Sequence, residues 1–375
     1  MKKLYRLDAW HKLLALRFKS LKWRHGVLIA LLILVTLTKM IPLWGFIYTT
    51  RIYPVIGTLL SPISGIFPFA VGDIFIALSI AWVILYPIYE MGWRKKMVLG
   101  RVAEYLLWVY AWFYIAWGLN YSQPNIFYRI GMKPVEVSKA KFKKFAYQYA
   151  DSINALSNAS LSNARKSISP DSIVDNALKN RVRDAVLKEY NKIGYREGIN
   201  RPFNQHPHAK TMVFTPLSSM AGVTGSMGPF FCEFTLNGDI LAHDYPATYA
   251  HEFAHFLGVA NEGEANFYSY IVCTASADKQ VRFSGYYHIF FHVLNNVYDI
   301  LGEKEGERFL KHIRPEIIQR ARNDRYYWLS KRCKALDAAQ DFIFELYLRG
   351  NHVAEGRKSY SGVIGLILAW EEKKK

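Results

Sequence analysis

Five consecutive residues near the middle of the chain have types and spacing suited to catalysis by a bound metal ion. They read His251-Glu252-Phe253-Ala254-His255. Residues four apart on an α-helix lie one turn apart on the same face, so His251 and His255 can direct both imidazoles at one ion. Two histidines and one further ligand leave a catalytic zinc with an open position for water. Glu252 is placed to act on that water, as in zinc metallopeptidases.

The third ligand is predicted to be an acidic residue. A pattern with three histidines would place the last one six residues after His255, but that position is Asn261. The five residues from Glu262 to Asn266 resemble the Glu-x-x-Ala-Asp/Asn segment of zinc peptidases with a glutamate ligand. The resemblance implies Glu262 as the ligand and Asn266, one turn later, as the residue that supports a histidine ligand. Glu264 stays open as the alternative, because a short turn can present either carboxylate.

The predicted chemistry is hydrolysis of a peptide bond. Zinc lowers the pKa of a bound water from about 15.7 to about 7. Glu252 would accept the water's proton and return it to the leaving amine. The oxygen of the attacked carbonyl also needs a hydrogen-bond donor. Six residues are candidates for this donor, and the sequence does not choose among them: Tyr268, Tyr286, Tyr287, His288, Arg357 and Tyr360.

Other histidines and the cysteines offer weaker metal patterns. His206 and His208 flank a proline in a loop-like segment, where we expect them to be solvated. His288 and His292 stand four apart, but no glutamate follows His288, so we interpret them as core or interface residues. The odd number of cysteines does not predict a disulfide framework, and their spacing fits no metal site. They are Cys232, Cys273 and Cys333.

The elements around the motif are predicted to hold it in a buried helix. Pro246 is suited to the first turn of that helix, and Gly258 to its end. Upstream, residues 212–214 and 230–236 have strand-like patterns, and the glycine-rich residues 218–228 between them indicate a flexible connection. A strand beside the metal helix could pair with an extended peptide substrate. An ordinary hairpin explains the same pattern equally well.

The first third of the chain is predicted to form a membrane anchor. Residues 1–25 are a basic leader, and residues 26–48 form an apolar run long enough to cross a bilayer. Residues 74–89 and 102–119 are predicted as a second and a third transmembrane helix. The proline- and glycine-rich residues 49–72 break the pattern of a regular span and indicate an outer loop with an interfacial or re-entrant segment.

Charge predicts the orientation of these helices. The leader has eight lysines and arginines against a single acidic residue, and residues 94–101 are also basic, whereas residues 49–72 contain only Arg51. By the positive-inside rule the N-terminus and the second loop are cytoplasmic. Everything after the third span is then extracytoplasmic, which in a bacterium is the periplasmic side of the inner membrane. The net charge of +18 is explained by this topology, so we predict no nucleic-acid partner.

The remaining segments are mostly helical in pattern. The predicted fold is an α-helical anchor of three transmembrane helices over residues 26–120, followed by a mainly α, α+β domain with a small β-sheet over residues 121–375. A buried helix is expected near the C-terminus, at residues 359–370. Six further helices are predicted, at residues 136–155, 172–193, 286–301, 303–313, 315–331 and 335–348.

The chain resembles a bacterial membrane family known as domain of unknown function 3810. The resemblance is carried by residues 251–255 and by Glu-Gly-Glu-Ala-Asn-Phe at residues 262–267. Weaker matches lie at residues 68–73, 117–121 and 359–360. It implies a membrane-bound, zincin-like protein and supplies no substrate.

Two functions are expected from these observations. The first is a zinc peptidase that acts on envelope proteins or peptides, with the lipid bilayer and a peptide substrate as partners. The alternative is a membrane protein that binds metal without catalysis and serves as a binding or scaffold module.

Overall fold

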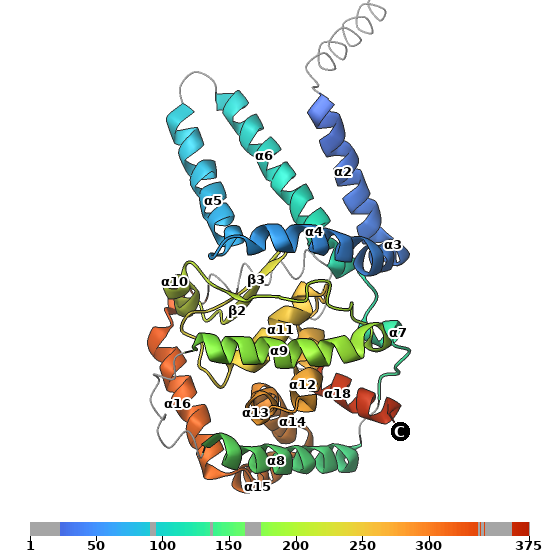
Figure 1. Cartoon of the computed structure of the whole chain (residues 1–375), viewed down its shortest axis with the longest axis vertical. Helices are drawn as coiled ribbons and strands as arrows, with labels where there is room; N and C mark the ends of the chain where they lie inside the picture. The colour runs from blue at the N-terminus through green and yellow to red at the C-terminus, as the bar shows by residue number, and fades with distance from the viewer. Residues whose placement is uncertain are drawn as a thin grey trace, which may run out of the picture.

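The computed structural model describes residues 23–90, 95–135, 138–161, 174–336 and 362–374, together with residues 338 and 341. These parts are mostly helical with one small sheet, in agreement with the predicted fold class. Three N-terminal helices project from a body that contains the sheet and the remaining helices (Figure 1). The predicted basic leader lies almost entirely outside the described residues.

The projecting helices are α2 (Trp23–Met40), α5 (Val71–Glu90) and α6 (Lys95–Ala116). Within the described residues, α2 and α5 are long and apolar enough to cross a membrane. The helix α6 carries charges in its first half, among them Arg101 and Glu104. The first predicted span is shorter than expected because Pro42 starts a separate helix, α3 (Pro42–Ile47). Proline disfavours the helical conformation of the residue that precedes it, and Ile41 accordingly has an extended backbone.

The proline- and glycine-rich segment forms a helix at the base of the projecting helices. A π-helical turn, η1 (Tyr48–Ile52), leads into α4 (Tyr53–Gly65), which lies across the ends of α2, α5 and α6 (Figure 1). Tyr53, Gly57, Ser61 and Ser64 form its buried face. The exposed side chains Val55, Leu59 and Ile63 are apolar. Such an amphipathic helix suits the surface of a membrane.

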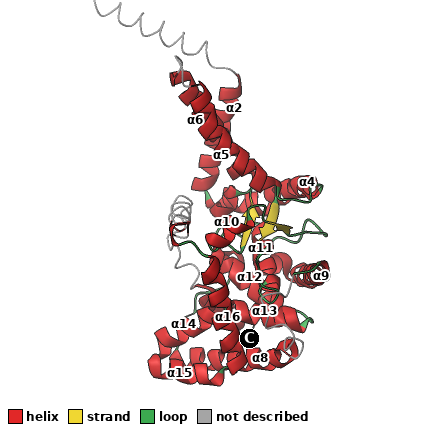
Figure 2. Cartoon of the chain, turned by 90° about the vertical axis from the view of Figure 1, so that its left-hand side faces the viewer, coloured by secondary structure: helices red, strands yellow, loops and turns green. Residues whose placement is uncertain are grey.

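Most helices of the body lie on the side of the sheet away from the projecting helices, as both views show (Figures 1 and 2). Several predicted helices are present with nearly the expected bounds. The segment predicted as one helix at residues 286–301 is interrupted at Ile289, and residues 335–348 lie mostly outside the described part. The helices of the body are α7 (Ile126–Arg129), α8 (Lys139–Leu161), α9 (Asn176–Ile193), α10 (Thr215–Met220), α11 (Tyr245–Phe256), α12 (Glu262–Ala275), α13 (Lys279–His288), α14 (Phe290–Leu301), α15 (Glu303–His312), α16 (Pro315–Lys331) and α18 (Gly362–Lys373), with short 3-10 helices η2 (Gly118–Ser122) and η4 (Gly194–Glu197).

The sheet has three short strands in the order β1-β3-β2. The central strand β3 (Glu233–Leu236) pairs in parallel with β1 (Lys210–Thr211) and antiparallel with β2 (Gly225–Gly228). The first strand was predicted at residues 212–214 and lies just upstream. Residues 218–228, predicted as a flexible connection, instead contain the end of α10 and the edge strand β2. Glycine has low strand propensity, so only pairing with β3 reveals β2.

A buried ion pair ties the sheet to the base of the projecting helices. Lys210 Nζ donates hydrogen bonds to Glu233 Oε2 at 2.7 Å and to the carbonyl oxygen of Ser64, at the end of α4, at 2.6 Å. Glu233 Oε1 accepts a hydrogen bond from the backbone N–H of Gly72, in the first turn of α5. The central strand is therefore held against the junction of α4 and α5. One hydrophobic core includes Tyr53 and Trp117 of the N-terminal region together with the residues of the body.

Candidate metal centre

The helices α11 and α12 position the predicted site residues. All twelve residues of α11 are buried, and Pro246 lies in its first turn. Beyond its end, Gly258 has a φ of +96°, a backbone conformation that glycine adopts without strain. Asn261 precedes α12, and its side chain accepts a hydrogen bond from the backbone N–H of Glu264 at 3.0 Å. The residue at the third-histidine position is thus the N-cap of the next helix.

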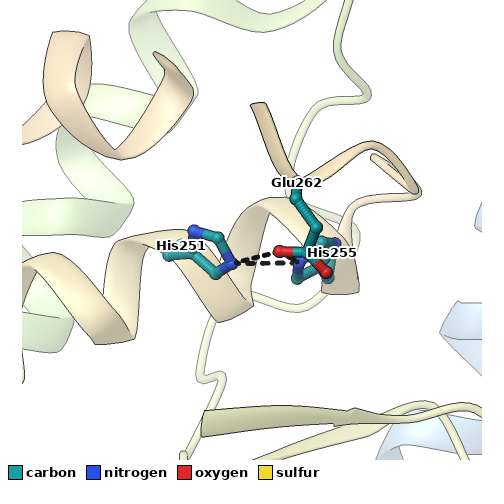
Figure 3. A group of neighbouring side chains, drawn as sticks. All are labelled: His251, His255 and Glu262. Atoms are coloured by element: carbon teal, nitrogen blue, oxygen red, sulfur yellow. Dashed lines mark hydrogen bonds and ion pairs between the residues drawn. The ribbon is translucent and has the colours of Figure 1, made fainter. Parts of the chain in front are cut away.

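The structure brings His251, His255 and Glu262 together (Figure 3). His251 Nε2 lies 3.1 Å from His255 Nε2 and 3.1 Å from Glu262 Oε2. His255 Nε2 lies 3.4 Å from the same carboxylate oxygen. The candidate ligand atoms all lie within 4.8 Å of one another. Two nitrogens and one oxygen that converge in this way form a donor set typical of zinc.

Glu264, the alternative third ligand, points elsewhere. Its carboxylate forms an ion pair with Arg129 and accepts a hydrogen bond of 2.9 Å from the backbone N–H of Ile126. The Arg129 and Glu264 side chains are 3% and 7% exposed. Residues two apart on a helix point about 200° apart, so only one of the two glutamates can face the histidines. That residue is Glu262.

The outer nitrogen of each histidine has an oxygen partner. His251 Nδ1 lies 2.8 Å from Asn266 Oδ1, and His255 Nδ1 lies 2.6 Å from the carbonyl oxygen of Val259. Both partners accept hydrogen bonds, so each Nδ1 carries a proton and each Nε2 faces the centre, where it can bind a cation once it is deprotonated. Asn266 therefore lies where the resemblance placed it, and it also accepts a hydrogen bond from His288 Nε2 at 2.9 Å. Such outer contacts fix the orientation of metal ligands.

The electrostatics of the three groups fit a cation. Burial raises the pKa of the Glu262 carboxyl. The two imidazoles lower it more strongly, so this pKa lies well below its usual range. Burial lowers the pKa of His255, but the Glu262 carboxylate outweighs this effect and raises it to about 9. A protonated imidazole thus balances the buried carboxylate. A divalent cation can replace that proton, because metal binding and proton release are coupled at histidine ligands.

Glu252 lies beside this group with one oxygen unused. Within the described residues its Oε2 is buried and has no hydrogen-bond partner. Burial raises the pKa of its carboxyl, and the charges of His251 and His255 partly offset the increase. Gly225 of β2 packs directly against it, since a Cβ there would lie 2.4 Å from Glu252 Oε1. A partnerless carboxylate oxygen beside a metal site is suited to accept a proton from water.

These groups line a cleft of about 770 Å³. One wall is the edge strand β2, and another is formed by His288 and His292. Residues from the end of α6 and the turn that follows it also line the cleft. Most of the other lining residues were not predicted as part of the site, among them Tyr121, Gly225 and Thr248. Tyr121 lies in the weaker family match at residues 117–121, so that match could have indicated that this segment contributes to the site.

Among the candidate oxyanion donors that the structure describes, His288 lines the cleft. Tyr268 donates its hydroxyl to the carbonyl oxygen of Glu197, and Tyr287 donates to Asp324, so both hydroxyls are engaged away from the cleft. Tyr286 packs its ring against the aromatic rings of α8 and α12. The last two candidates, Arg357 and Tyr360, lie outside the described residues.

The other candidate metal residues lie apart from this centre. His206 and His208 are exposed and line a separate cavity of about 490 Å³ between α4 and α9. His243 lies 2.8 Å from Asp324, in a hydrogen-bonded group with Tyr287. The three cysteines are free. Burial raises the pKa of Cys232 and of Cys273 to about 12, which keeps both thiols protonated and unreactive at neutral pH.

Comparison with known proteins gives one match. The model of the family described as "Protein of unknown function (DUF3810)" matches residues 48–368. The chain belongs to this family. The matched range contains α4, the edge strand and all residues of the candidate metal centre. No curated protein and no solved structure matches the chain.

Proposed function

We propose that this protein is a membrane-anchored zinc peptidase that hydrolyses peptide bonds of envelope proteins or peptides. One observation carries the proposal: His251, His255 and Glu262 converge in a cleft where one oxygen of the buried Glu252 has no hydrogen-bond partner among the described residues. The backbone edge of β2 in the same cleft suits an extended peptide rather than a small substrate.

Each residue of the centre has a distinct role in this proposal. His251, His255 and Glu262 would hold the ion, with Asn266 fixing the orientation of His251. A bound zinc would polarise the substrate carbonyl and lower the pKa of a water to about 7. Glu252 accepts the proton of the attacking water and transfers it to the leaving amine, which makes it the catalytic base and then the acid. The single N–H of neutral His288 is donated to Asn266, so in this proposal His288 supports the residue that orients His251.

The anchor is proposed to cross the inner membrane three times, with the body in the periplasm. The third crossing is α6, which projects from the body beside α2 and α5 and runs antiparallel to α5 (Figure 1). Its exposed side chains include Leu99, Leu106 and Leu107. Arg24 and Glu104 form an ion pair between α2 and α6. The basic residues at the ends away from the body favour a cytoplasmic location for those ends.

The full chain purified in detergent provides the test, because the anchor and the body share one core. We expect about one zinc per chain by mass spectrometry of the metal, and hydrolysis of peptides from a mixed library. His251→Ala should lose the zinc. Glu252→Gln has nearly the same size, and it should keep the zinc while hydrolysis falls by roughly 100-fold or more.

Two results would contradict the proposal. One is a wild-type protein that stays well below one zinc per chain after zinc is supplied during purification. The other is hydrolysis that survives Glu252→Gln. If wild-type protein holds zinc but cleaves nothing, and a cellular phenotype needs His251 but not Glu252, the protein is a metal-binding module without catalysis.

A further inference from the structure

The edge strand β2 leads from the candidate metal centre to the membrane end of the body. Gly225, at its start, packs against Glu252. Gly228, at its end, lies beside Gly72 in the first turn of α5, since a Cβ on Gly72 would lie 4.0 Å from Gly228 Cα. Two residues beyond the strand, the ring of Phe230 lies 4.9 Å from that of Phe75 on α5. The strand therefore has a defined direction relative to the anchor.

One side of β2 is available for pairing. Asn237 N donates to Thr224 O at 2.9 Å, so this pair is hydrogen-bonded across the strands. Bonding alternates along an antiparallel ladder, so Ser226 bonds to β3, whereas Gly225 and Met227 point their N–H and C=O groups away from it. In the described part of the chain the sheet has no strand on that side, and the cleft borders it.

The surface where the body meets the projecting helices is apolar. Exposed side chains there belong to the segment before α5 and to the segment around the start of α10. They are Phe67, Phe69, Val213, Phe214 and Leu217. The cleft itself is walled on this side by Phe113, Trp117 and Tyr121. An exposed apolar rim of this kind fits contact with a lipid surface, so a substrate that approaches along β2 comes from the bilayer.

We infer that the substrate is a protein anchored in the same membrane, cut a few residues outside the bilayer on the C-terminal side of its anchor. The inference rests on the proposed function. A peptide that pairs antiparallel with β2 runs from the α5 end toward Glu252, because β2 runs the opposite way. Antiparallel pairing is the more stable arrangement. The residues before the scissile bond then lie toward the membrane, and the residues after it lie toward the body.

The length of the strand sets the position of the cut. From Gly225 to Gly228 the strand has four residues, and the three steps between them cover roughly 10 Å. The headgroup layer on each side of a bilayer adds about 5–7 Å. An extended substrate therefore places its scissile bond about three to six residues from the end of its anchor.

The test uses the full chain in liposomes with three forms of one peptide of randomised sequence. The first form follows an N-terminal transmembrane helix, the second precedes a C-terminal transmembrane helix, and the third is free. We expect the N-terminally anchored form to be cleaved about tenfold faster or more than the other two, since the anchor presents it to the cleft in the matching direction. Mass spectrometry of the products should place the cut within about six residues of the anchor, even when a longer spacer is inserted.

Two variants at one position test the pairing itself. Met227→Pro removes the outward N–H and leaves the bonds between β2 and β3, whereas Met227→Ala removes only the side chain. The ratio of the hydrolysis rates of the two variants isolates the contribution of the backbone N–H. We expect Met227→Pro to be slower by about tenfold, which corresponds to the loss of one hydrogen bond of about 1.4 kcal/mol. Zinc content reports whether each variant has folded.

The outcomes separate this inference from the proposed function. Cleavage of all three peptide forms at equal rates, abolished by Glu252→Gln, would keep the peptidase and overturn the inference. Faster cleavage of the C-terminally anchored form would reverse the direction of the substrate and also overturn it. Equal rates for Met227→Pro and Met227→Ala would show that β2 does not pair with the substrate. No cleavage of any form by zinc-loaded wild-type protein would contradict the proposed function itself.

Discussion

The indole Nε1 of Trp117 donates a hydrogen bond of 2.9 Å to the carbonyl oxygen of His255. Trp117 directly follows α6, so the end of a projecting helix contacts the backbone of a candidate metal ligand. The last carbonyls of a helix have no partners within it and need donors from elsewhere. Three further side chains donate to the next three carbonyl oxygens: Tyr53 to Phe256, Asn200 to Leu257 and Gln123 to Gly258, at 2.7, 2.8 and 2.7 Å.

We predict that Trp117→Phe lowers both stability and zinc affinity. The substitution keeps an aromatic ring but removes the N–H, which should cost about 0.5–1.5 kcal/mol. Trp112→Phe is the matched control, because Trp112 Nε1 also donates one hydrogen bond, to Phe230 O at 3.0 Å, away from His255. Thermal unfolding and zinc titration of both variants measure the effect. Equal losses of zinc affinity would show that the contact with His255 has no special role.

Glu262 and Glu264 should respond differently to the same change. Glu262→Gln removes a ligand charge, so we expect loss of stoichiometric zinc with a folded protein. Glu264→Gln breaks a buried ion pair with Arg129, so we expect destabilisation of about 3–5 kcal/mol, with zinc retained by the protein that folds. Metal analysis and thermal unfolding of both variants distinguish the roles. Zinc loss in Glu264→Gln without destabilisation would reverse the assignment.

Gly225→Ala should block catalysis and spare the metal. The added methyl group would lie 2.4 Å from Glu252 Oε1, closer than atoms in contact allow, so the carboxylate must move. We expect hydrolysis to fall by roughly 100-fold, the scale of a lost general base, while the zinc content stays near one per chain. Measuring both quantities on one preparation provides the internal control. Full activity in this variant would mean that Glu252 does not act from its observed position.

Asp244, at the start of α11, should make stability depend on pH. Burial raises the pKa of its carboxyl to about 6, and His243 acts in the opposite direction. A raised carboxyl pKa contributes stability that is fully present below about pH 4 and lost as the pH rises through about 6. Asp244→Asn removes the ionising group, so its Tm relative to wild type should increase by a few degrees between about pH 5 and pH 8. A Tm difference that does not change with pH would contradict this assignment.

Local patterns were sufficient to predict the helices of the centre. Helical spacing places His251 and His255 on one face, and Gly258 ends their helix as expected. The geometry also favours Glu262 over Glu264, but the reason is distant in sequence. Arg129, which pairs with Glu264, lies 135 residues away. A short motif cannot predict such a partner.

The edge strand and the break in the last core helices were not predictable for a related reason. The sequence of β2 is Gly-Ser-Met-Gly, and these residues form a strand because they pair with β3 rather than because of their own strand propensity. At Ile289 the apolar pattern continues without proline or glycine, yet α13 ends and α14 begins. Packing against the rest of the body decides both features, and a single sequence does not encode it locally.

The Lys210–Glu233 pair also sets an order of assembly. Its outer partners, Ser64 and Gly72, leave the ribosome well before Glu233 does, and they lie at the ends of α4 and α5, which belong to the proposed membrane anchor. A chain whose first helices fail to insert would leave a buried carboxylate with too few donors, which costs several kcal/mol. The strand that borders the cleft is then left incomplete. Under the proposed function, a copy in the wrong compartment stays inactive because its fold is unfinished, and no separate inhibitor is required.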